Sequence, residues 1–145
     1  MRFKGKCVVV TGASSGMGRK IALDFAKEGA TVIAVARRLE RLEEIAKEAE
    51  SFAGKILPYQ GDISLEEVNN SMIDYAVKEC GKLDVLVNNA GIMDEFTPIG
   101  ELTDELFNKV MAVNLNGPIY AMRKAVQVML EQETKGNIVN IASIG

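Results

Sequence analysis

TGASSGMG, residues 11–18, decides the fold, because this short stretch fits two different templates. From Gly12 to Gly16 it reads G-x-S-x-G, the strand-to-helix turn that carries the nucleophile of many serine hydrolases. From Thr11 to Gly18 it reads T-G-x-x-x-G-x-G, a glycine-spaced loop of the kind that holds a pyrophosphate at the start of a helix. Both templates place a strand before the loop and a helix after it, so residues elsewhere have to separate them.

The chain has no histidine, and this separates the two templates. A serine nucleophile requires a base that accepts its proton, and that base is nearly always histidine. We therefore rank the hydrolase last and interpret the stretch as a phosphate-binding loop, in which glycines leave room for the ligand and backbone N–H groups point at it. A plain turn is the alternative, because glycine-rich turns between strand and helix also occur without a ligand.

The composition is typical of one packed domain over residues 1–145, with 48% hydrophobic residues and 3 prolines. The net charge of −3 comes from scattered basic and acidic residues, so we expect no nucleic-acid partner. No apolar run approaches the ~20 residues that span a bilayer, and we expect no membrane partner and a cytoplasmic location. Cys7 and Cys80 lack C-x-x-C spacing and are predicted to be free thiols; no metal site is predicted.

Short β-branched runs alternate with longer helical patterns. The predicted strands are at 6–12, 30–36, 55–61, 82–91 and 136–143, and their apolar character predicts that both faces of each are covered. This alternation predicts an α/β fold, a doubly wound parallel sheet. Because the chain stops just after the fifth strand, we expect a sheet that is incomplete at its carboxyl end.

The helical patterns carry further predictions. A helix with one buried stripe is predicted where apolar residues recur every three or four positions, at Leu39, Leu42, Ile45, Ala49 and Phe52. Ser64 and Glu67 have the spacing of a capping box, which predicts that Ser64 caps the next helix. The longest pattern covers about 103–131, with a bend expected near 114–117 because glycine weakens a helix interior.

Four motifs appear in order: T-G-x-x-x-G-x-G at 11–18, N-N-A-G at 88–91, N-x-x-G at 114–117 and GNIVNIASIG at 136–145. In this combination the chain resembles the short-chain dehydrogenase/reductase family. The resemblance implies a Rossmann fold and reversible hydride transfer between a nicotinamide cofactor and a small-molecule carbonyl or alcohol. It also implies catalytic roles for Ser143 and Asn114, which stand where the family has its catalytic serine and asparagine.

The end of the second predicted strand bears on the choice of cofactor. NAD-binding folds place an acidic residue there, which binds the ribose 2′-hydroxyl, whereas this chain has Ala36 followed by Arg37 and Arg38. Arginines in the first turn of a helix face the positive end of its dipole, and a bound 2′-phosphate would offset that repulsion. The resemblance therefore implies NADP rather than NAD. The alternative is that both arginines are surface charges paired with Glu40 or Glu44.

The resemblance also implies roles for residues along the carboxyl edge of the sheet. Ser14 and Ser15 would add hydroxyl donors to the phosphate, Asp62 and Ile63 would lie at the adenine, and residues 89–91 would pass the ribose. Asp62 is equally consistent with a turn, and Asn88 with bonding to neighbouring backbone. The predicted cofactor-binding residues are Gly12, Ser14, Ser15, Gly16, Met17, Gly18, Arg37, Arg38, Asp62, Ile63, Asn89, Ala90 and Gly91.

The family also uses a tyrosine and a lysine, spaced Y-x-x-x-K on the helix after the serine strand. We expect this pair beyond Gly145, and we expect residues 1–145 alone not to catalyse hydride transfer at an enzymic rate. Tyr120 and Lys124 have the same spacing but precede Ser143, and we interpret Tyr120 as a packing residue. The helix at 103–131 often serves as a subunit interface in the family, which implies a homo-oligomer, a dimer or tetramer. A non-catalytic dinucleotide-binding or sensing module is the alternative function.

Overall fold

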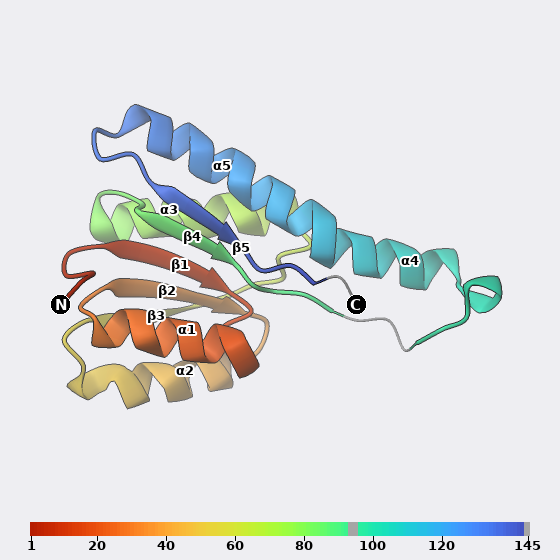
Figure 1. The fold of residues 1–145 in the computed structure, drawn as a ribbon, viewed down its shortest axis with the longest axis horizontal. Helices are drawn as coiled ribbons and strands as arrows, with labels where there is room; N and C mark the ends of the chain where they lie inside the picture. The colour runs from red at the N-terminus through yellow and green to blue at the C-terminus, as the bar shows by residue number, and fades with distance from the viewer. Residues whose placement is uncertain (93–95, 144–145) are drawn as a thin grey trace.

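A five-stranded parallel sheet forms the centre of the computed structural model, which describes residues 1–92 and 96–143 (Figure 1). The strand order is β3-β2-β1-β4-β5, so the chain starts in the middle and winds outward in both directions. This arrangement confirms the predicted doubly wound α/β fold. The strands are β1 (Cys7–Thr11), β2 (Thr31–Ala36), β3 (Lys55–Gln60), β4 (Val85–Asn88) and β5 (Asn137–Asn140).

Helices cover both faces of the sheet. One face carries α1 (Gly16–Lys27) and α2 (Leu39–Glu48), and the other carries α3 (Glu66–Cys80) and α5 (Gly117–Glu131), whereas α4 (Asp104–Met111) extends past the sheet edge (Figure 1). Because alternate residues of a strand point to opposite faces, Val8 and Val10 join one apolar cluster while Cys7 and Val9 join the other. The other described helical elements are two 3-10 turns, Ala49–Ser51 and Ile99–Glu101, and a π-helical turn, Ala112–Asn116.

The edge strands differ from the prediction that every strand is covered on both faces. β1, β4 and nearly all of β2 are buried, but β3 is only half-buried and most of β5 is exposed. In β5, which has the sequence NIVN, even the apolar Val139 is 44% exposed. Burial depends on the neighbours that topology supplies, and an edge strand has a neighbour on one side only.

The helix with the predicted buried stripe is confirmed in its middle. Leu42, Ile45 and Ala49 are buried, while Leu39 and Phe52 at the two ends are half-buried. The α-helix itself ends at Glu48 and tightens into the 3-10 turn that follows. Helices commonly tighten in this way in their last turn.

The predicted capping box at the start of α3 is wrong. The N-cap is Leu65, and no side chain caps the helix there. The Asn69 amide, from within the first turns, instead donates to the backbone oxygens of Ile63 (2.7 Å) and Leu65 (3.0 Å). Local spacing suggested Ser64 as the cap, but the Ser64 N–H is turned toward the Asp62 carboxylate (3.0 Å).

The long helical pattern is present with a change of pitch inside it. Thr103 caps α4 by accepting from the Leu106 N–H (3.2 Å), and a π-helical turn at Ala112–Asn116 connects α4 to α5. The irregularity was predicted at this place from Gly117. The structure adds that Asn114 lies inside the turn, and π-turns often occur at functional sites.

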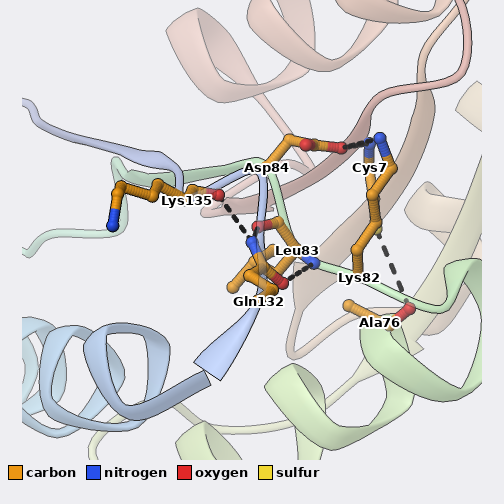
Figure 2. A network of polar contacts seen from close by, with 7 residues as sticks. All are labelled: Cys7, Ala76, Lys82, Leu83, Asp84, Gln132 and Lys135. Carbon is orange, nitrogen blue, oxygen red and sulfur yellow. Dashed lines mark hydrogen bonds and ion pairs between the residues drawn. The ribbon is translucent and has the colours of Figure 1, made fainter. Parts of the chain in front are cut away.

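A polar network holds the sheet at its amino edge (Figure 2). The Asp84 carboxylate accepts from the Cys7 N–H (2.8 Å) and pairs with Lys82 (3.0 Å). The Gln132 side chain accepts from the Leu83 N–H (3.1 Å) and donates to the Leu83 oxygen (2.5 Å). These contacts join β1, β4 and the end of α5 at the edge opposite the glycine loop.

Both cysteines are free thiols, as predicted. Cys7 is fully buried, and this burial raises the pKa of its thiol well above the usual range; the adjacent Cys80 and Asp84 add to the rise. A thiol of this kind is a poor nucleophile at neutral pH. None of the described helices is long and apolar enough to cross a membrane.

Candidate functional site

The loop between β1 and α1 depends on glycine at two close approaches. Gly12 has φ +63°, and a Cβ there would lie 2.8 Å from the Ala90 Cα. A Cβ on Gly18 would lie 2.1 Å from the Gly12 oxygen, so helix and loop pack without room for a side chain. Gly16 has φ +57° and open space around it, which leaves that part of the loop accessible to a ligand.

Thr11 ties this loop to the segment that follows β4. Its Oγ1 accepts from the backbone N–H groups of Asn89 (3.0 Å) and Ala90 (3.1 Å). The Asn89 amide donates in return to the oxygens of Thr11 (3.3 Å) and Gly12 (3.2 Å). Thr11 was missed as a site residue, although its place as the first letter of the loop motif is the signal that could have identified it.

A cavity of about 330 Å³ opens at the carboxyl ends of the strands. Parallel α/β sheets bind their ligands at this edge. The cavity brings together every predicted cofactor-binding residue except Gly16, Met17 and Gly18, which lie in the first turn of α1 outside its lining. Ala36, which marks the missing acidic residue, also lines the cavity, and sequence reasoning missed four further lining residues, namely Val35, Gly61, Ile92 and Val113.

Two helix N-termini face this cavity. Ser15 is the N-cap of α1 and Arg38 that of α2; both line the cavity, and neither helix start is capped by a side chain. Uncapped N-termini leave backbone N–H groups available and carry the positive end of the helix dipole. The cavity is therefore suited to an anionic ligand.

Arg37 and Arg38 are exposed at the rim of the cavity. Within residues 1–92 and 96–143, neither guanidinium forms an ion pair, so the interpretation as partners of Glu40 or Glu44 is not supported. The Arg37 backbone oxygen accepts from the Gln60 side chain (3.1 Å), which links the ends of β2 and β3. Two uncompensated cations at a helix N-terminus favour a ligand with an additional anionic group.

Asp62 has the turn role that the sequence left open, and its predicted contact with adenine stays a prediction. Its carboxylate accepts from the Ser64 N–H (3.0 Å), so it is a turn residue. It also lines the cavity, together with Ile63. The turn therefore holds Asp62 and Ile63 at the cavity wall.

A second cavity, of about 550 Å³, adjoins the first and contains Ser143 and Asn114. Residues 89–92 line both cavities, so a ligand that crosses this segment reaches from one to the other. Ser143 comes three residues after the end of β5, at the same carboxyl edge as the glycine loop. A dinucleotide in the first cavity and a small substrate in the second would thus meet beside Ser143.

Asn114 clamps the segment that separates the cavities. Its side chain accepts from the Ile92 N–H (2.8 Å) and donates to the Ile92 oxygen (2.6 Å). The buried Asn88 donates to the side-chain oxygen of Asn140 (3.0 Å), so its partner is a side chain on β5 rather than the neighbouring backbone that we expected. Both asparagines thereby hold the end of β4.

Tyr120 and Lys124 line neither cavity. Lys124 pairs with Asp74 on α3 (3.2 Å), and the Arg123 guanidinium lies over the Tyr120 ring, 5.5 Å from its centroid. The Lys124–Asp74 pair joins α5 to α3, and the contact between Arg123 and Tyr120 lies within α5. The described residues contain no group of three or more cysteine, aspartate or glutamate side chains placed to hold a metal ion.

The comparison with known proteins identifies the family. The model of the family described as short chain dehydrogenase matches residues 6–145. The chain belongs to the short-chain dehydrogenase/reductase family. The glycine loop, the N-N-A-G segment and the strand before Ser143 all fall within the matched range.

Relatives of this short-chain dehydrogenase/reductase include enzymes with different substrates in their names. It is 37% identical over 140 residues to the 3beta-hydroxysteroid dehydrogenase 2 of Eggerthella lenta, covering 97% of this chain and 54% of that protein. It is 38% identical over 144 residues to the farnesol dehydrogenase of Aedes aegypti, covering 99% of this chain and 59% of that protein. The chain thus spans between about half and three-fifths of the length of these relatives.

Solved structures of the family superimpose closely on the fold. A short-chain type dehydrogenase/reductase from Mycobacterium marinum matches with a TM-score of 0.92 and 33% identity, over 97% of this chain and 57% of that one. A metagenomic short-chain oxidoreductase in complex with NADP matches with a TM-score of 0.93 and 30% identity, over 99% and 65%. Membership of this family supports an NAD(P)-dependent oxidoreductase.

Proposed function

We propose that residues 1–145 are the dinucleotide-binding unit of an oxidoreductase that transfers a hydride between NADP(H) and a carbonyl or alcohol. The observation that carries this proposal is the pair of adjoining cavities, one faced by two helix N-termini and two arginines, the other lined by Ser143 and Asn114. The cofactor supplies the hydride chemistry when it is bound. The protein has to bind it, orient it and move one proton.

The residues at the first cavity fit NADP(H). The loop at Gly12, Ser14 and Ser15 would hold the pyrophosphate, because its backbone lies at the start of α1 with open space beside Gly16. Arg37 and Arg38 would bind the ribose 2′-phosphate, and Asp62 and Ile63 would lie against the adenine. Gly16, Met17 and Gly18 lie outside the cavity lining. They would contribute to binding by setting the backbone conformation of the loop that holds the pyrophosphate.

Ser143 and Asn114 are proposed to act on the substrate side. The Ser143 hydroxyl would donate to the substrate oxygen, while Asn114 holds residues 89–92 in place through Ile92. An acid must also protonate the developing alkoxide. We propose that a tyrosine and a lysine spaced four residues apart, beyond Gly145, provide it, in keeping with the greater length of the relatives.

The proposal also includes a homo-oligomeric state and a cytoplasmic location. The α4–α5 face carries exposed Phe107, Leu115, Ile119 and Val126, which supports a homo-oligomer formed through this face. Free, uncrosslinked Cys7 and Cys80 are consistent with a reducing, cytoplasmic location. The names of the relatives differ in substrate, and we propose no narrower class than small carbonyl compounds and alcohols.

The reaction is tested by the oxidation of NADPH, followed at 340 nm against a panel of ketones. Residues 1–145 should turn over slowly or not at all, and a chain continued beyond Gly145 should be active, because loss of a positioned acid removes about 10²–10⁴ in rate. Ser143→Ala in the continued chain should abolish most of this activity. Dinucleotide binding without turnover in the continued chain would favour a sensing module. Fast turnover by residues 1–145 that is lost in Tyr120→Phe would assign the acid to Tyr120.

A further inference from the structure

Asn69 lies outside every sequence motif, yet it contacts the wall of the cofactor cavity. It sits on α3, is 1% exposed, and is the one described residue with a buried side-chain polar atom that lacks a hydrogen-bond partner. That atom is Oδ1; the amide nitrogen donates to the oxygens of Ile63 (2.7 Å) and Leu65 (3.0 Å). Burying an amide with an unpaired acceptor is unfavourable. The presence of Asn69 at this position therefore needs an explanation, and the two donated bonds suggest one.

These two bonds fix the backbone on both sides of Ser64. Ile63 and Leu65 belong to the turn that leads from β3 into α3, and α3 has no side-chain cap at Leu65. The Asp62 carboxylate closes the turn from the other side through the Ser64 N–H (3.0 Å). The Asn69 amide therefore holds the Ile63 and Leu65 carbonyls on both sides of Ser64 and sets where the Ile63 carbonyl points.

Ile63 is held from a second direction by α5. A Cβ on Gly117 would lie 2.6 Å from the Ile63 oxygen and 2.5 Å from its Cδ1, so the first turn of α5 packs directly against it. Ile63 itself is buried and lines the first cavity next to Asp62. The carbonyl thus lies between the Asn69 amide and the Gly117 Cα, which leaves the Ile63 residue little freedom to move along the cavity wall.

We propose that Asn69 is a positioning residue for the adenine half of the cofactor. It acts through Ile63 and does not line the cavity itself. The inference rests on the proposed dinucleotide binding, because Ile63 and Asp62 form the adenine side of the site only if a dinucleotide binds there. Gly117 supports the same residue from the opposite side.

The test compares the dissociation constants of NADPH and of adenosine 2′,5′-bisphosphate, which carries only the adenine half. Asn69→Leu and Asn69→Asp keep the approximate size of the side chain but remove both N–H donors. Each should weaken both ligands by the same factor, about tenfold. Gly117→Ala should produce the same loss, because its added methyl group would push the Ile63 carbonyl from the other side.

Gln132→Leu is the matched control, because Gln132 also bonds backbone groups but at the amino edge of the sheet. It should lower the melting temperature and leave both dissociation constants unchanged. Unchanged affinities in Asn69→Leu and Gly117→Ala, with a lowered melting temperature, would assign Asn69 a purely structural role and overturn the inference. If Asn69→Leu does not fold, the dissociation constants of Gly117→Ala decide whether the inference holds. Failure of the unmodified chain to bind either ligand would instead overturn the proposed function, and the inference with it.

Discussion

At the glycine loop, the absence of a side chain is what allows neighbouring segments to approach closely. Gly12 and Gly18 allow contacts that any side chain would block, and the amide of Asn89 reaches the Gly12 oxygen through the gap beside Gly18. Gly16 is different, because nothing lies within 4 Å of the position of its Cβ. Its requirement for glycine comes from φ +57° and from the ligand that we place beside it.

Gly16→Val is expected to abolish dinucleotide binding and to preserve most of the helical circular dichroism. The valine side chain would occupy the open space where the pyrophosphate should lie. Gly81→Val is a matched control, because Gly81 has a similar φ of +80° and open surroundings but caps α3 away from both cavities. Both variants should lose comparable stability, since both force a branched residue into the left-handed region. Retained binding in Gly16→Val would mean that the loop is only a turn.

Residues predicted from contiguous motifs lie together in the structure, and their role in cofactor binding stays a prediction. Residues 12, 14 and 15 and the segments at 37–38, 62–63 and 89–91 all line one cavity, as the order of strands and loops implied. Asn69 could not be found in this way, because its role depends on Ile63 and on Gly117, which only folding brings together. The cap at Ser64 was mispredicted for a related reason, since the Asp62 carboxylate competes for the Ser64 N–H.

Among the elements, β1 and β4 are joined by side-chain hydrogen bonds at both ends. The carboxyl end borders the proposed site, and the amino end stabilises the sheet. At the carboxyl end, Thr11 and Asn89 build the site. At the amino end, Asp84 and Gln132 close the sheet (Figure 2). We therefore expect that substitutions at the amino end alter stability without altering ligand binding. The exposure of Val139 in β5 could not be predicted from its side chain, because it follows from the position of that strand at the edge of the sheet.

Asp84→Ala should destabilise the fold without weakening cofactor binding. It would leave the Cys7 N–H buried without a partner, which costs about 1–3 kcal/mol in the free energy of unfolding. Asp74→Ala removes a carboxylate of the same type from an exposed pair with Lys124 and should have a much smaller effect. Urea denaturation measures both changes, and NADPH titration of the folded variants supplies the second readout. Equal losses in the two variants would contradict the importance assigned to the amino-edge network.

At the scale of the whole molecule, the cofactor site exists only when the sheet is assembled. The ends of β1, β2, β3 and β4 each contribute lining residues, and the N-termini of α1 and α2 point at the same cavity. We propose that the charge at this edge favours NADPH over NADH. Arg37 and Arg38 have no ion-pair partner in residues 1–92 and 96–143. A 2′-phosphate could therefore pair with both guanidinium groups without displacing a carboxylate.

Substituting the arginines tests the origin of this preference. Arg37→Ala and Arg38→Ala should each weaken NADPH and leave NADH nearly unchanged, because only NADPH carries the 2′-phosphate. Arg41→Ala is the matched control, since Arg41 is exposed in the first turn of α2, which follows Arg38, but does not line the cavity. It should alter neither affinity. An equal loss of NADPH affinity in Arg41→Ala would indicate a long-range charge effect rather than contact with the phosphate.

The most direct test of the account is the ratio of the NADH and NADPH dissociation constants for the unmodified chain. Both are measured by nicotinamide fluorescence at a single ionic strength, so that screening of the arginines is the same for the two ligands. We predict that NADPH binds at least about tenfold more tightly, a difference of about 1.4 kcal/mol. Equal affinities, tighter binding of NADH, or no saturable binding of either dinucleotide would contradict the site that we assign to this edge of the sheet.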